Sequence, residues 1–334
     1  MRNTVSFAIA TYNSERTLER CLTSIRNQDY DQTKIEIVIA DGGSKDSTLD
    51  IAKKFSAKIK KVPNHLQNAE YNKGVAVNAS LGEIIALIDH DNILPDKKWL
   101  SKMLKPLNKD KKIFGSGVLR FKYDKSLSLL DRYFSLFGVN DPSVFYFNKS
   151  AHQSYIYDSF HLRAKMVDNF TDYFKVKLDP NSFPALGGNG ALVRRNMLRK
   201  ANVDPKYFFH IDVHLDLAKK GFRDYAFVKE SVLHLSDNKV IPFLKRRMYF
   251  MEKYYLLENK KRRYLLFNPK TDKIKLLYFV IISITIVIPL IDSFRGYRKI
   301  RDVAWFLHPI MCLAILFVYG IPIFKRRAYG FLEG

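Results

Sequence analysis

The chain has 334 residues, enough for one large domain or two small ones, and its 47 % hydrophobic content excludes a disordered protein. The formal net charge of +23 requires an anionic neighbour: a membrane face, a phosphorylated substrate or nucleic acid. The two cysteines, Cys21 and Cys312, are too few for a disulfide framework and fit a reducing, cytosolic setting.

The first 120 residues alternate between strand and helix patterns. The apolar run Thr4–Ala10 is typical of a buried parallel strand, and no cleavage site follows that would make it a signal peptide. Ser14 and Asp46 are in position to cap helices that start just after them. Further strands are expected at Ile35–Ala40, Lys58–Val62, Glu83–Ile88 and Ile113–Phe121, and helices from Glu15, over Asn68–Ser80 and from near Asp96. The alternation predicts an α/β protein with a doubly wound, mostly parallel sheet and helices on both faces.

Polar clusters follow three of these strands: Thr11–Asn13, Asp41–Ser44 and Asp89–Asp91. A doubly wound sheet binds its ligands at such strand ends. The two carboxylates of Asp89-x-Asp91 suit a hard cation, whose remaining ligands a diphosphate can supply, although a solvated turn would show the same pattern. Asp41 is a natural acceptor for the N3–H group of uracil, and a turn or helix-capping aspartate is the alternative.

The region after residue 121 is less regular. Lys122–Pro180 is rich in aromatic residues, with helical spacing only around Leu127–Phe137, and we interpret it as an insertion over the site. A glycine-rich loop, Pro184–Gly190, precedes an apolar strand and then a helix over His210–Lys220 that Gly221 ends.

Two histidines, His210 and His214, share one face of that last helix. A zinc-protease signature needs a glutamate directly after the first histidine, where this chain has Ile211, and no third ligand is obvious. Asp212 in the same helix, near the glycine-rich loop, is better explained as a general base.

A basic segment and two apolar stretches follow. Residues 239–273 contain eleven Lys or Arg and three acidic residues, and we expect a helix over Val240–Asn259. As helices, Leu276–Ile291 and Val303–Phe324 would reach roughly 24 and 33 Å, against a hydrocarbon core of about 30 Å. Basic clusters flank both stretches, so two spans and a re-entrant or interfacial hairpin both stay open. The expected domains are 1–238 (catalytic), 239–273 (basic linker helix) and 274–334 (hydrophobic hairpin on the cytoplasmic face of an anionic membrane).

Six blocks of sequence, in order over about residues 4–235, resemble the family-2 glycosyltransferases, which have the GT-A fold. They are TYNSERTLERCLTSI, EIVIADGGSKDST, NKGVAVNASLGEIIALIDHDNILP, GGNGALVRR, FFHIDVHLDLAKKGF and SVLHLS. The resemblance implies that a nucleotide-sugar donor is bound by Asp41, Asp89 and Asp91. We expect further donor contacts from Thr11, Tyr12, Asn13, Asn72 and Arg247, the last of which lies beyond the resembling blocks. The resemblance implies a divalent metal, Mn²⁺ or Mg²⁺, held by Asp89, Asp91 and His234. It also implies that Asp212 is the catalytic base and that Gly188, Asn189 and Gly190 face the acceptor.

The chain departs from the family pattern at two places. The family's Glu-Asp motif reads Ile211-Asp212 here, so a supporting carboxylate is missing while the base is retained. The Q-x-x-R-W motif of processive polysaccharide synthases is absent; Arg246 and Arg247 are present without the tryptophan, which argues against a processive enzyme.

These features predict an inverting glycosyltransferase that moves a sugar from a nucleotide-diphosphate donor, most simply a UDP-sugar, to a hydroxyl of a membrane-located, lipid-linked acceptor. One alternative keeps the fold and uses polyprenyl phosphate, which is already ionised at neutral pH and needs no base. A nucleic-acid-binding protein is motivated only by the charge, and no nucleic-acid motif occurs, so we expect no nucleic-acid partner.

Overall fold

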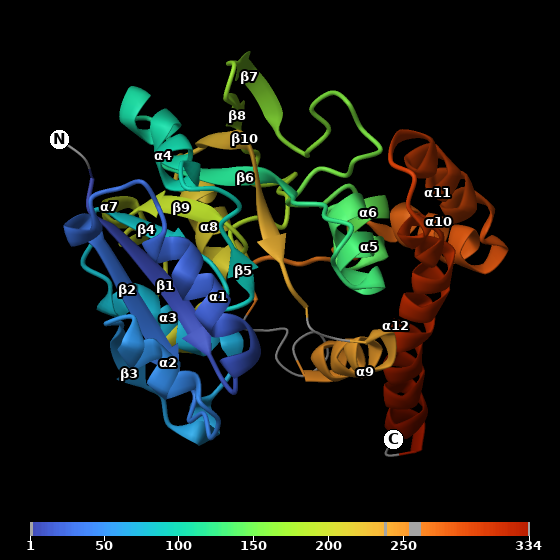
Figure 1. Ribbon diagram of the computed structural model, residues 1–334. Coiled ribbons are helices and arrows are strands. Elements are labelled where there is room, and N and C mark those ends of the chain that lie inside the picture. Colours follow the sequence, from blue (N-terminus) through green and yellow to red (C-terminus); the bar gives the residue numbers. More distant parts are fainter. Residues whose placement is uncertain (1–2, 237–238, 254–261, 333–334) are drawn as a thin grey trace. The chain divides into compact units, whose positions relative to one another are not determined.

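The computed structural model describes residues 3–236, 239–253 and 262–332, which belong to two units (Figure 1). The sheet unit comprises Met1–Lys122 and Arg163–Leu235, and the helical unit comprises Tyr123–Leu162 and Ser236–Gly334. These limits differ from the three sequence-based domains, because residues 123–162 pack with the C-terminal helices. Their aromatic side chains lie in one buried cluster with apolar residues from beyond position 240, among them Tyr133, Phe134, Phe137, Phe243, Trp305 and Met311.

A mixed sheet organises the first unit. Within the described residues its strand order is β3 (Lys58–Lys61), β2 (Ile35–Asp41), β1 (Val5–Thr11), β4 (Ile84–Leu87), β9 (Ala191–Arg194), β6 (Gly115–Phe121), β10 (Asp224–His234), β8 (Tyr173–Lys177) and β7 (Lys165–Asn169), and β5 (Asn92–Ile93) pairs with β10. The first four strands are parallel, and β9 is antiparallel between β4 and β6. Strand β10 then runs parallel to β6. The predicted α/β class with a mostly parallel sheet is confirmed.

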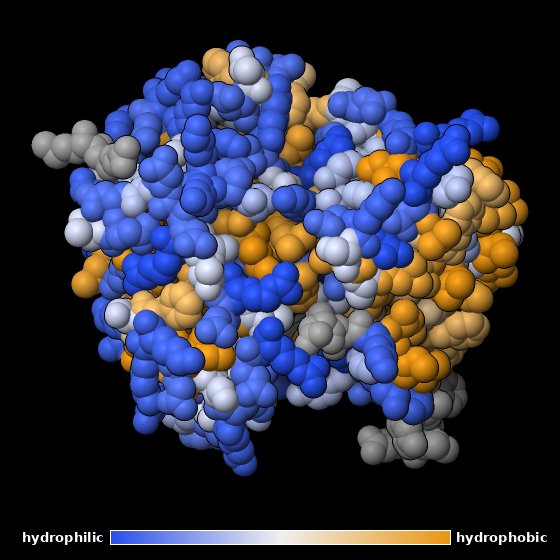
Figure 2. Space-filling view, viewed as in Figure 1, coloured by the Kyte–Doolittle hydropathy of each residue, from blue (hydrophilic) through white to orange (hydrophobic). Residues whose placement is uncertain are grey.

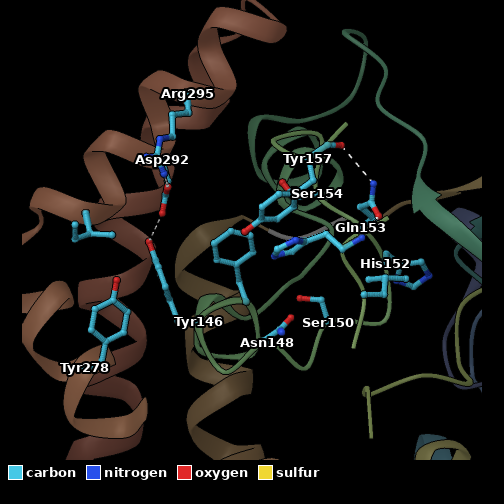
Figure 3. A pocket seen from close by; sticks show the side chains of 14 residues that line it. Tyr146, Asn148, Ser150, His152, Gln153, Ser154, Tyr157, Tyr278, Asp292 and Arg295 are labelled. Atoms are coloured by element: carbon cyan, nitrogen blue, oxygen red, sulfur yellow. Dashed lines mark hydrogen bonds and ion pairs between the residues drawn. The ribbon is translucent and has the colours of Figure 1, made fainter. Parts of the chain in front are cut away.

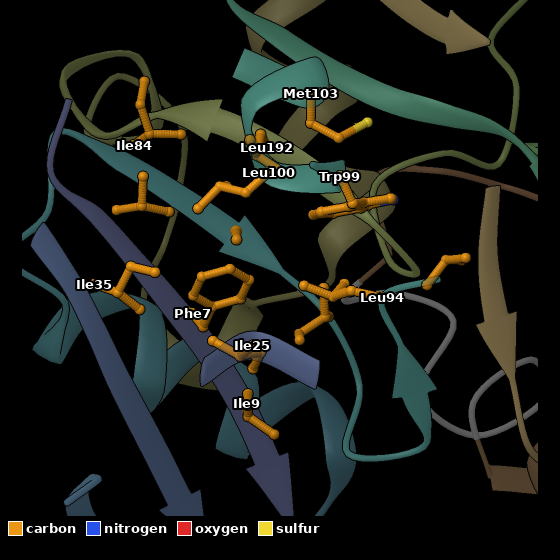
Figure 4. Packing of buried hydrophobic residues seen from close by; sticks show 14 of the residues in the cluster. Phe7, Ile9, Ile25, Ile35, Ile84, Leu94, Trp99, Leu100, Met103 and Leu192 are labelled. Carbon is orange, nitrogen blue, oxygen red and sulfur yellow. The ribbon is translucent and has the colours of Figure 1, made fainter. Parts of the chain in front are cut away.

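Helices cover both sides of these strands. In Figure 1, α1 lies in front of β1 and α3 lies behind it. The helices of this unit are α1 (Glu15–Arg26), α2 (Thr48–Lys54), α3 (Ala69–Ala79), α4 (Trp99–Lys109), α7 (Arg195–Leu198) and α8 (His210–Lys219). The apolar positions of the predicted strands and helices meet in one core, which Figure 4 shows around Phe7, Ile25, Ile84, Trp99 and Leu192. Burial of these side chains stabilises the strands, and so holds in place the edge of the sheet where the polar clusters follow β1, β2 and β4.

The capping of α1 differs from the expectation. The Ser14 hydroxyl accepts a hydrogen bond from the Tyr12 N–H (3.2 Å) and does not cap the helix. Asp46 caps α1 instead. One of its carboxylate oxygens accepts a hydrogen bond from the Glu15 N–H (3.1 Å), and the other accepts one from the Thr48 N–H (3.0 Å) at the start of α2. A single carboxylate therefore holds the starts of α1 and α2, where unpaired N–H groups favour an anion.

The helical unit contains α5 (Leu129–Phe137), α6 (Pro142–Tyr146), α9 (Val240–Phe250), α10 (Lys273–Thr285), α11 (Val287–Lys299), the 3₁₀ turn Val303–Phe306 and α12 (Leu307–Leu332). The predicted helix Val240–Asn259 extends into residues 254–261, which lie outside the described part of the chain.

The first apolar stretch is not one continuous helix. The chain breaks at Ile286, which has a left-handed φ of 54°, and α10 and α11 bend by 80° there. Pro289 explains the break, because in a continuous helix it would have to donate an N–H to Thr285, whereas in the first turn of a new helix no such donor is needed.

The helical unit exposes many large apolar side chains. Figure 2 shows apolar residues gathered over the C-terminal helices. We define the apolar face by exposed residues of α10 and α11: Ile274, Leu277, Ile281, Ile284, Val287, Leu290, Ile291 and Phe294. Among the described residues, Val303–Lys325 is the one helix long and apolar enough to cross a membrane, and the bent α10–α11 pair passes the same test as a unit.

Candidate active site

The end of β2 holds a buried carboxylate whose oxygens are fully engaged. Asp41 Oδ1 accepts from the backbone N–H groups of Gly43 (3.0 Å) and Ser44 (2.8 Å), and Oδ2 accepts from the hydroxyls of Thr11 (2.9 Å) and Ser44 (2.5 Å). A carboxylate has about four lone-pair sites, so these donors fill them. The structure thus shows Asp41 fixing the loop after β2 against the end of β1.

Next to this loop, Tyr12 and Asn13 extend the end of β1. Asn13 has a left-handed φ of 48°, stabilised because its N–H donates to the Ser44 hydroxyl (2.8 Å) and its Oδ1 accepts from the Lys45 N–H (2.9 Å). The Tyr12 ring is 41 % exposed. An exposed ring on a tightly bonded turn is a surface on which a planar ligand can stack.

Asn72 of α3 lies behind the same strand ends. Its side chain is 1 % exposed, and its Nδ2 donates to the Thr11 carbonyl (3.3 Å). Its Oδ1 is buried and has no hydrogen-bond partner within the described residues. A buried, unpaired amide oxygen is unusual and marks a place where a ligand's donor would be stabilised.

The carboxylate of Asp89, just after β4, is paired with a cation of α3. Lys73 Nζ contacts Asp89 Oδ1 and also donates to the Ile88 carbonyl (3.0 Å), and the Lys73 side chain is only 3 % exposed. Burial alone would raise the pKa of Asp89, but Lys73, with His210 and His90 nearby, lowers that pKa to about 2. Asp89 is therefore ionised at neutral pH.

Asp91 is brought to the end of β10. His234 stands opposite Asn92 in the β5–β10 ladder, and the Leu235 N–H donates to the Asp91 carbonyl (2.9 Å). Asp91 Oδ2 and His234 Nε2 are 3.7 Å apart. Two ligands of one cation, each at about 2.1 Å, can be that far apart, so this pair fits a divalent metal. The His234 Nδ1 is buried without a hydrogen-bond partner in the described chain.

No complete metal cage is built from protein side chains. Among the described residues, no group of three or more His, Cys, Asp or Glu side chains surrounds one point. The predicted ligands Asp89, Asp91 and His234 are therefore not gathered around one point: Asp91 lies beside His234, while Asp89 is paired with Lys73. Their joint role as metal ligands stays a prediction.

The glycine-rich loop lies against the first turn of α8. A Cβ atom at Gly187 would approach the His210 carbonyl to 3.0 Å, and one at Gly188 would approach His210 Nε2 to 3.1 Å. Position 187 also has a φ of +116°, a conformation that favours glycine. Gly190 joins the loop to the sheet, because its N–H donates to the Leu87 carbonyl (3.2 Å).

Asp212 lies in that first turn and has no exposed surface. Beside it, Glu70 of α3 accepts from the His210 backbone N–H (3.1 Å) and from its ring Nδ1 (2.8 Å). Burial would raise the pKa of Glu70, but His210 and Lys73 lower it. A carboxylate from another helix therefore contacts His210, the residue that precedes Ile211.

Arg247 belongs to α9 in the helical unit. Its guanidinium donates to Asn140 and lies 5.3 Å from the centre of the Phe243 ring. Its role in donor binding stays a prediction.

The family model for glycosyl transferase family 2 matches residues 6–199, which is more than half of the chain. The chain belongs to glycosyl transferase family 2. The matched residues carry the strand-end clusters of β1, β2 and β4 and the glycine-rich loop.

Individual relatives match over different lengths. Glycosyltransferase AglE of Haloferax volcanii is 27 % identical over 133 residues, 39 % of this chain, and this match spans only 43 % of its own length. The GalNAc(5)-diNAcBac-PP-undecaprenol beta-1,3-glucosyltransferase of Campylobacter jejuni is 24 % identical over 306 residues, which covers 85 % of this chain and 93 % of that protein. The mannosyltransferase PcManGT from Pyrobaculum calidifontis, solved in complex with GDP-Man and Mn²⁺, matches in structure with a TM-score of 0.53 and 15 % identity over 97 % of this chain and 88 % of its own. This likeness confirms the predicted GT-A fold.

The sequence blocks of the family did not indicate two contacts of this site. Glu70 and Lys73 are three residues apart on one face of α3, and they pair with His210 and Asp89. Their spacing puts both on one side of the helix, but a charged pair on a helix is usually solvated, so sequence reasoning passed over them.

A cavity lies in the helical unit. It has a volume of about 380 Å³ and is lined by residues such as Tyr146, Gln153, Tyr157, Asp292 and Arg295 (Figure 3). The Tyr146 hydroxyl donates to Asp292 (3.0 Å), and the Gln153 amide donates to the Tyr157 carbonyl (3.3 Å). Because these polar groups of the wall are already hydrogen-bonded to one another, they do not indicate a particular ligand.

Proposed function

We propose that this chain is an inverting glycosyltransferase that moves a sugar from a nucleotide-diphosphate donor, a UDP-sugar, to a hydroxyl of a membrane-located, lipid-linked acceptor. The observation that carries the proposal is that Asp89, which Lys73 holds ionised at the end of β4, lies near the first turn of α8. This turn carries Asp212 and packs against the glycine-rich loop through His210. Family membership supports the reaction class, and the full-length similarity to an undecaprenol-linked glucosyltransferase supports the acceptor class.

The donor lies at the carboxyl ends of β1, β2 and β4 in this proposal. Tyr12 stacks on the base, Thr11, Asn13 and Asp41 shape the loop that borders it, and the unpaired Asn72 oxygen accepts a hydrogen bond from the nucleoside. Because Asp41 already accepts four hydrogen bonds, it reads a uracil N3–H only after the Ser44 hydroxyl turns away. Arg247 is a further donor-binding candidate, on the evidence of the sequence alone.

Asp89, Asp91 and His234 would hold Mn²⁺ or Mg²⁺, and the donor's diphosphate would supply further ligands. When bound, the metal supplies electrostatic stabilisation of the leaving diphosphate. Lys73 keeps Asp89 ionised, and the β5–β10 ladder places Asp91 beside His234.

The acceptor hydroxyl faces Gly188, Asn189 and Gly190 and attacks the anomeric carbon from the side opposite the diphosphate. Its pKa is far above neutrality, so its proton must leave during the attack. We place the base in the first turn of α8, where Asp212 is the candidate that the sequence selects.

The helical unit attaches the enzyme to the cytoplasmic face of an anionic membrane. The exposed apolar face of α10 and α11 and the Val303–Lys325 helix support this part of the proposal. The +23 charge of the chain favours anionic lipids.

Polyprenyl phosphate is the competing acceptor, and a panel of donors and acceptors separates the two. The full chain in detergent is given UDP- and GDP-sugars with Mn²⁺ or Mg²⁺, and either polyprenyl phosphate or a polyprenyl-diphosphate-linked N-acetylhexosamine. We expect transfer to the sugar hydroxyl of the second acceptor. Sugar transfer to polyprenyl phosphate alone would replace the acceptor, and no transfer from any nucleotide sugar would refute the proposal.

The Asp212→Asn variant tests the base. It keeps shape and hydrogen bonding but accepts no proton, so single-turnover transfer to a hydroxyl should fall by about 10²–10⁴-fold. Nucleotide affinity by calorimetry should stay unchanged, because Asp212 does not lie among the proposed donor contacts. Transfer within a factor of a few of wild type would remove Asp212 from this role.

A further inference from the structure

The bent pair, α10 with α11, carries its exposed apolar and charged residues in separate zones. Its middle, from Leu276 to Ile291, contains no charged residue and exposes most of the apolar face. Exposed cations lie at both ends: Lys273 at the start of α10, and Arg295 and Arg298 towards the end of α11. Such a surface complements a lipid leaflet, with hydrocarbon around the apolar middle and anionic headgroups at the basic ends.

Both ends of the bent pair are bonded to one segment of the helical unit, residues 147–158. At the start of α10, Lys275 Nζ donates to the Phe147 carbonyl (3.0 Å). At the end of α11, Lys299 Nζ forms an ion pair with Asp158 (2.5 Å), whose side chain is 89 % exposed. This segment forms no helix or strand, and irregular backbone is not found exposed to the hydrocarbon of a bilayer. The two ends of the bent pair therefore belong on the same, aqueous side.

The length of the two helices sets how deep the bend reaches. Each helix has 13 residues and is roughly 20 Å long, so a straight helix made of both would cross a hydrocarbon core of about 30 Å. With the bend of 80° and both ends level, the apex at Ile286 stands about 13 Å from the ends, within the ~15 Å of one leaflet. The bend thus makes a segment of spanning length fit a single leaflet.

Helix α12, which is long and apolar enough to cross, packs against α5, α6, α9, α10 and α11 (Figure 1). His308 bonds tyrosine hydroxyls of α5 and α6, and further along α12 Tyr319 donates to Asp141 at the start of α6. Leu244 of α9 packs in the same cluster as Tyr319, and the next residue, Lys245, is exposed. A span by α12 would carry these helices and their charges into hydrocarbon, and this cost disfavours such a span.

We propose that the helical unit is monotopic: the bent pair enters one leaflet with its apex at Ile286, and no described helix crosses the bilayer. This inference rests on the membrane attachment in the proposed function and specifies it. The partner is a single leaflet whose acyl chains surround the apolar face and whose anionic headgroups meet the cations at both ends. Lys325, in the last part of α12, then stays on the same side of the membrane as Arg301, which precedes that helix.

Cysteine labelling tests this topology in the full chain. The native thiols, Cys21 and Cys312, are buried and give little background. Arg301→Cys and Lys325→Cys put single exposed thiols on either side of the apolar part of α12, and Leu81→Cys marks the sheet unit. Sealed inside-out vesicles from expressing cells are treated with a membrane-impermeant maleimide. We expect equal labelling of all three variants before detergent is added, whereas a thiol at position 325 that reacts only after detergent would overturn the inference.

Lipid-borne spin labels test the depth of insertion. A fluorophore is attached to Val287→Cys, beside the apex, or to Ile274→Cys, near a basic end, where the side chains are 55 % and 83 % exposed. In anionic vesicles, a spin label deep in the acyl chains should quench the fluorophore at position 287 more strongly than that at position 274, and a headgroup spin label should give the reverse order. Equal quenching at both positions would overturn insertion of the apex. Absence of quenching at position 287 would also overturn it, because another protein surface would then cover the apolar face.

Failure of this inference is separable from failure of the proposed attachment. Wild-type protein that stays in solution when anionic vesicles sediment would overturn both. Vesicle-bound protein in which Lys325 lies on the opposite side from Arg301 would overturn the monotopic topology alone.

Discussion

Each of the two units buries one histidine without any exposed surface, and the two rings are satisfied differently. In the sheet unit, His214 Nδ1 bonds the His210 carbonyl of its own helix (2.7 Å), and its Nε2 has no hydrogen-bond partner among the described residues. In the helical unit, both nitrogens of His308 bond tyrosine hydroxyls, Tyr133 at Nδ1 and Tyr146 at Nε2, each at 3.0 Å.

The helical unit continues this pattern into a chain of hydrogen bonds. Tyr146 donates its hydroxyl proton to Asp292 (3.0 Å), so it accepts from His308 Nε2, and His308 Nδ1 accepts from Tyr133. The same unit exposes the apolar face of α10 and α11, whereas most large apolar residues of the sheet unit lie in the core of Figure 4. A protein segment that lies in lipid needs its buried polar groups to be hydrogen-bonded to one another and its exposed side chains to be apolar. The difference supports the proposal that the helical unit contacts lipid, whereas the sheet unit carries the candidate active site.

The largest expected effect tests the sheet unit alone. Asp91→Asn removes the charge that faces His234, so nucleotide-sugar turnover should fall by about 10³-fold or more, as expected when an electrostatic contact to the leaving group is lost. Turnover is measured as nucleotide release, with and without EDTA.

The same variant must keep the property of the other unit. Asp91→Asn protein should sediment with anionic vesicles as the wild type does, because it leaves the apolar face intact. Wild-type turnover that survives EDTA would contradict the metal site, and loss of vesicle binding in Asp91→Asn would break the division between the two units.

The sequence predicts the sheet unit better than the helical unit. The alternation of strands and helices and the three polar strand ends follow from local patterns, and the structure places those clusters where β1, β2 and β4 end. Pairs such as Glu70 with His210, 140 residues apart, are set by tertiary packing and leave no local signal.

The helical unit depends on contacts that no local pattern records. Residues 123–162 join the C-terminal helices through a buried aromatic cluster, and the sequence shows aromatic content but not its partner. The break at Ile286 was missed because hydropathy is continuous across it; Pro289 was the signal that could have indicated it.

A medium effect tests the helical unit alone. Ile281→Glu combined with Ile284→Glu puts two charges on the apolar face, where the side chains are 52 % and 63 % exposed. Each charge costs about 2.5–3.5 kcal/mol at the centre of a bilayer, so binding to vesicles should weaken at least about tenfold. Sedimentation with anionic vesicles at high salt measures the effect.

The matched control is Leu81→Glu, which changes an equally exposed (65 %) apolar residue of the sheet unit. It should bind vesicles as the wild type does. Equal weakening by both changes would show that general charge, and not the apolar face of α10 and α11, determines attachment.

The smallest expected effect concerns the histidine that the sheet unit leaves half-satisfied. Burial lowers the pKa of His214 from about 6.5 to about 4, although its bond to the His210 carbonyl opposes that shift. Between pH 6.5 and pH 4 His214 is protonated in the unfolded chain and neutral in the folded unit. The free energy of unfolding therefore has its full value above pH 6.5 and decreases as the pH falls towards 4. The loss at pH 4.5 is about 2 kcal/mol, which lowers the melting temperature by roughly 4–8 °C. Glu70 and Asp89, whose pKa values are lowered in the folded unit, begin to lose their stabilising contribution only near the unfolded values of 4.5 and 3.8, so they add little to the loss above pH 4.5. His214→Met keeps a side chain of similar size against Phe114 and Tyr225 but has no proton to bind, so its melting temperature should vary less between pH 6.5 and 4.5 than that of the wild type. Melting curves across that range compare the slopes and not the absolute stabilities, because the variant also loses the bond to the His210 carbonyl. An unchanged slope in His214→Met would show that the buried ring is not what makes the sheet unit sensitive to acid.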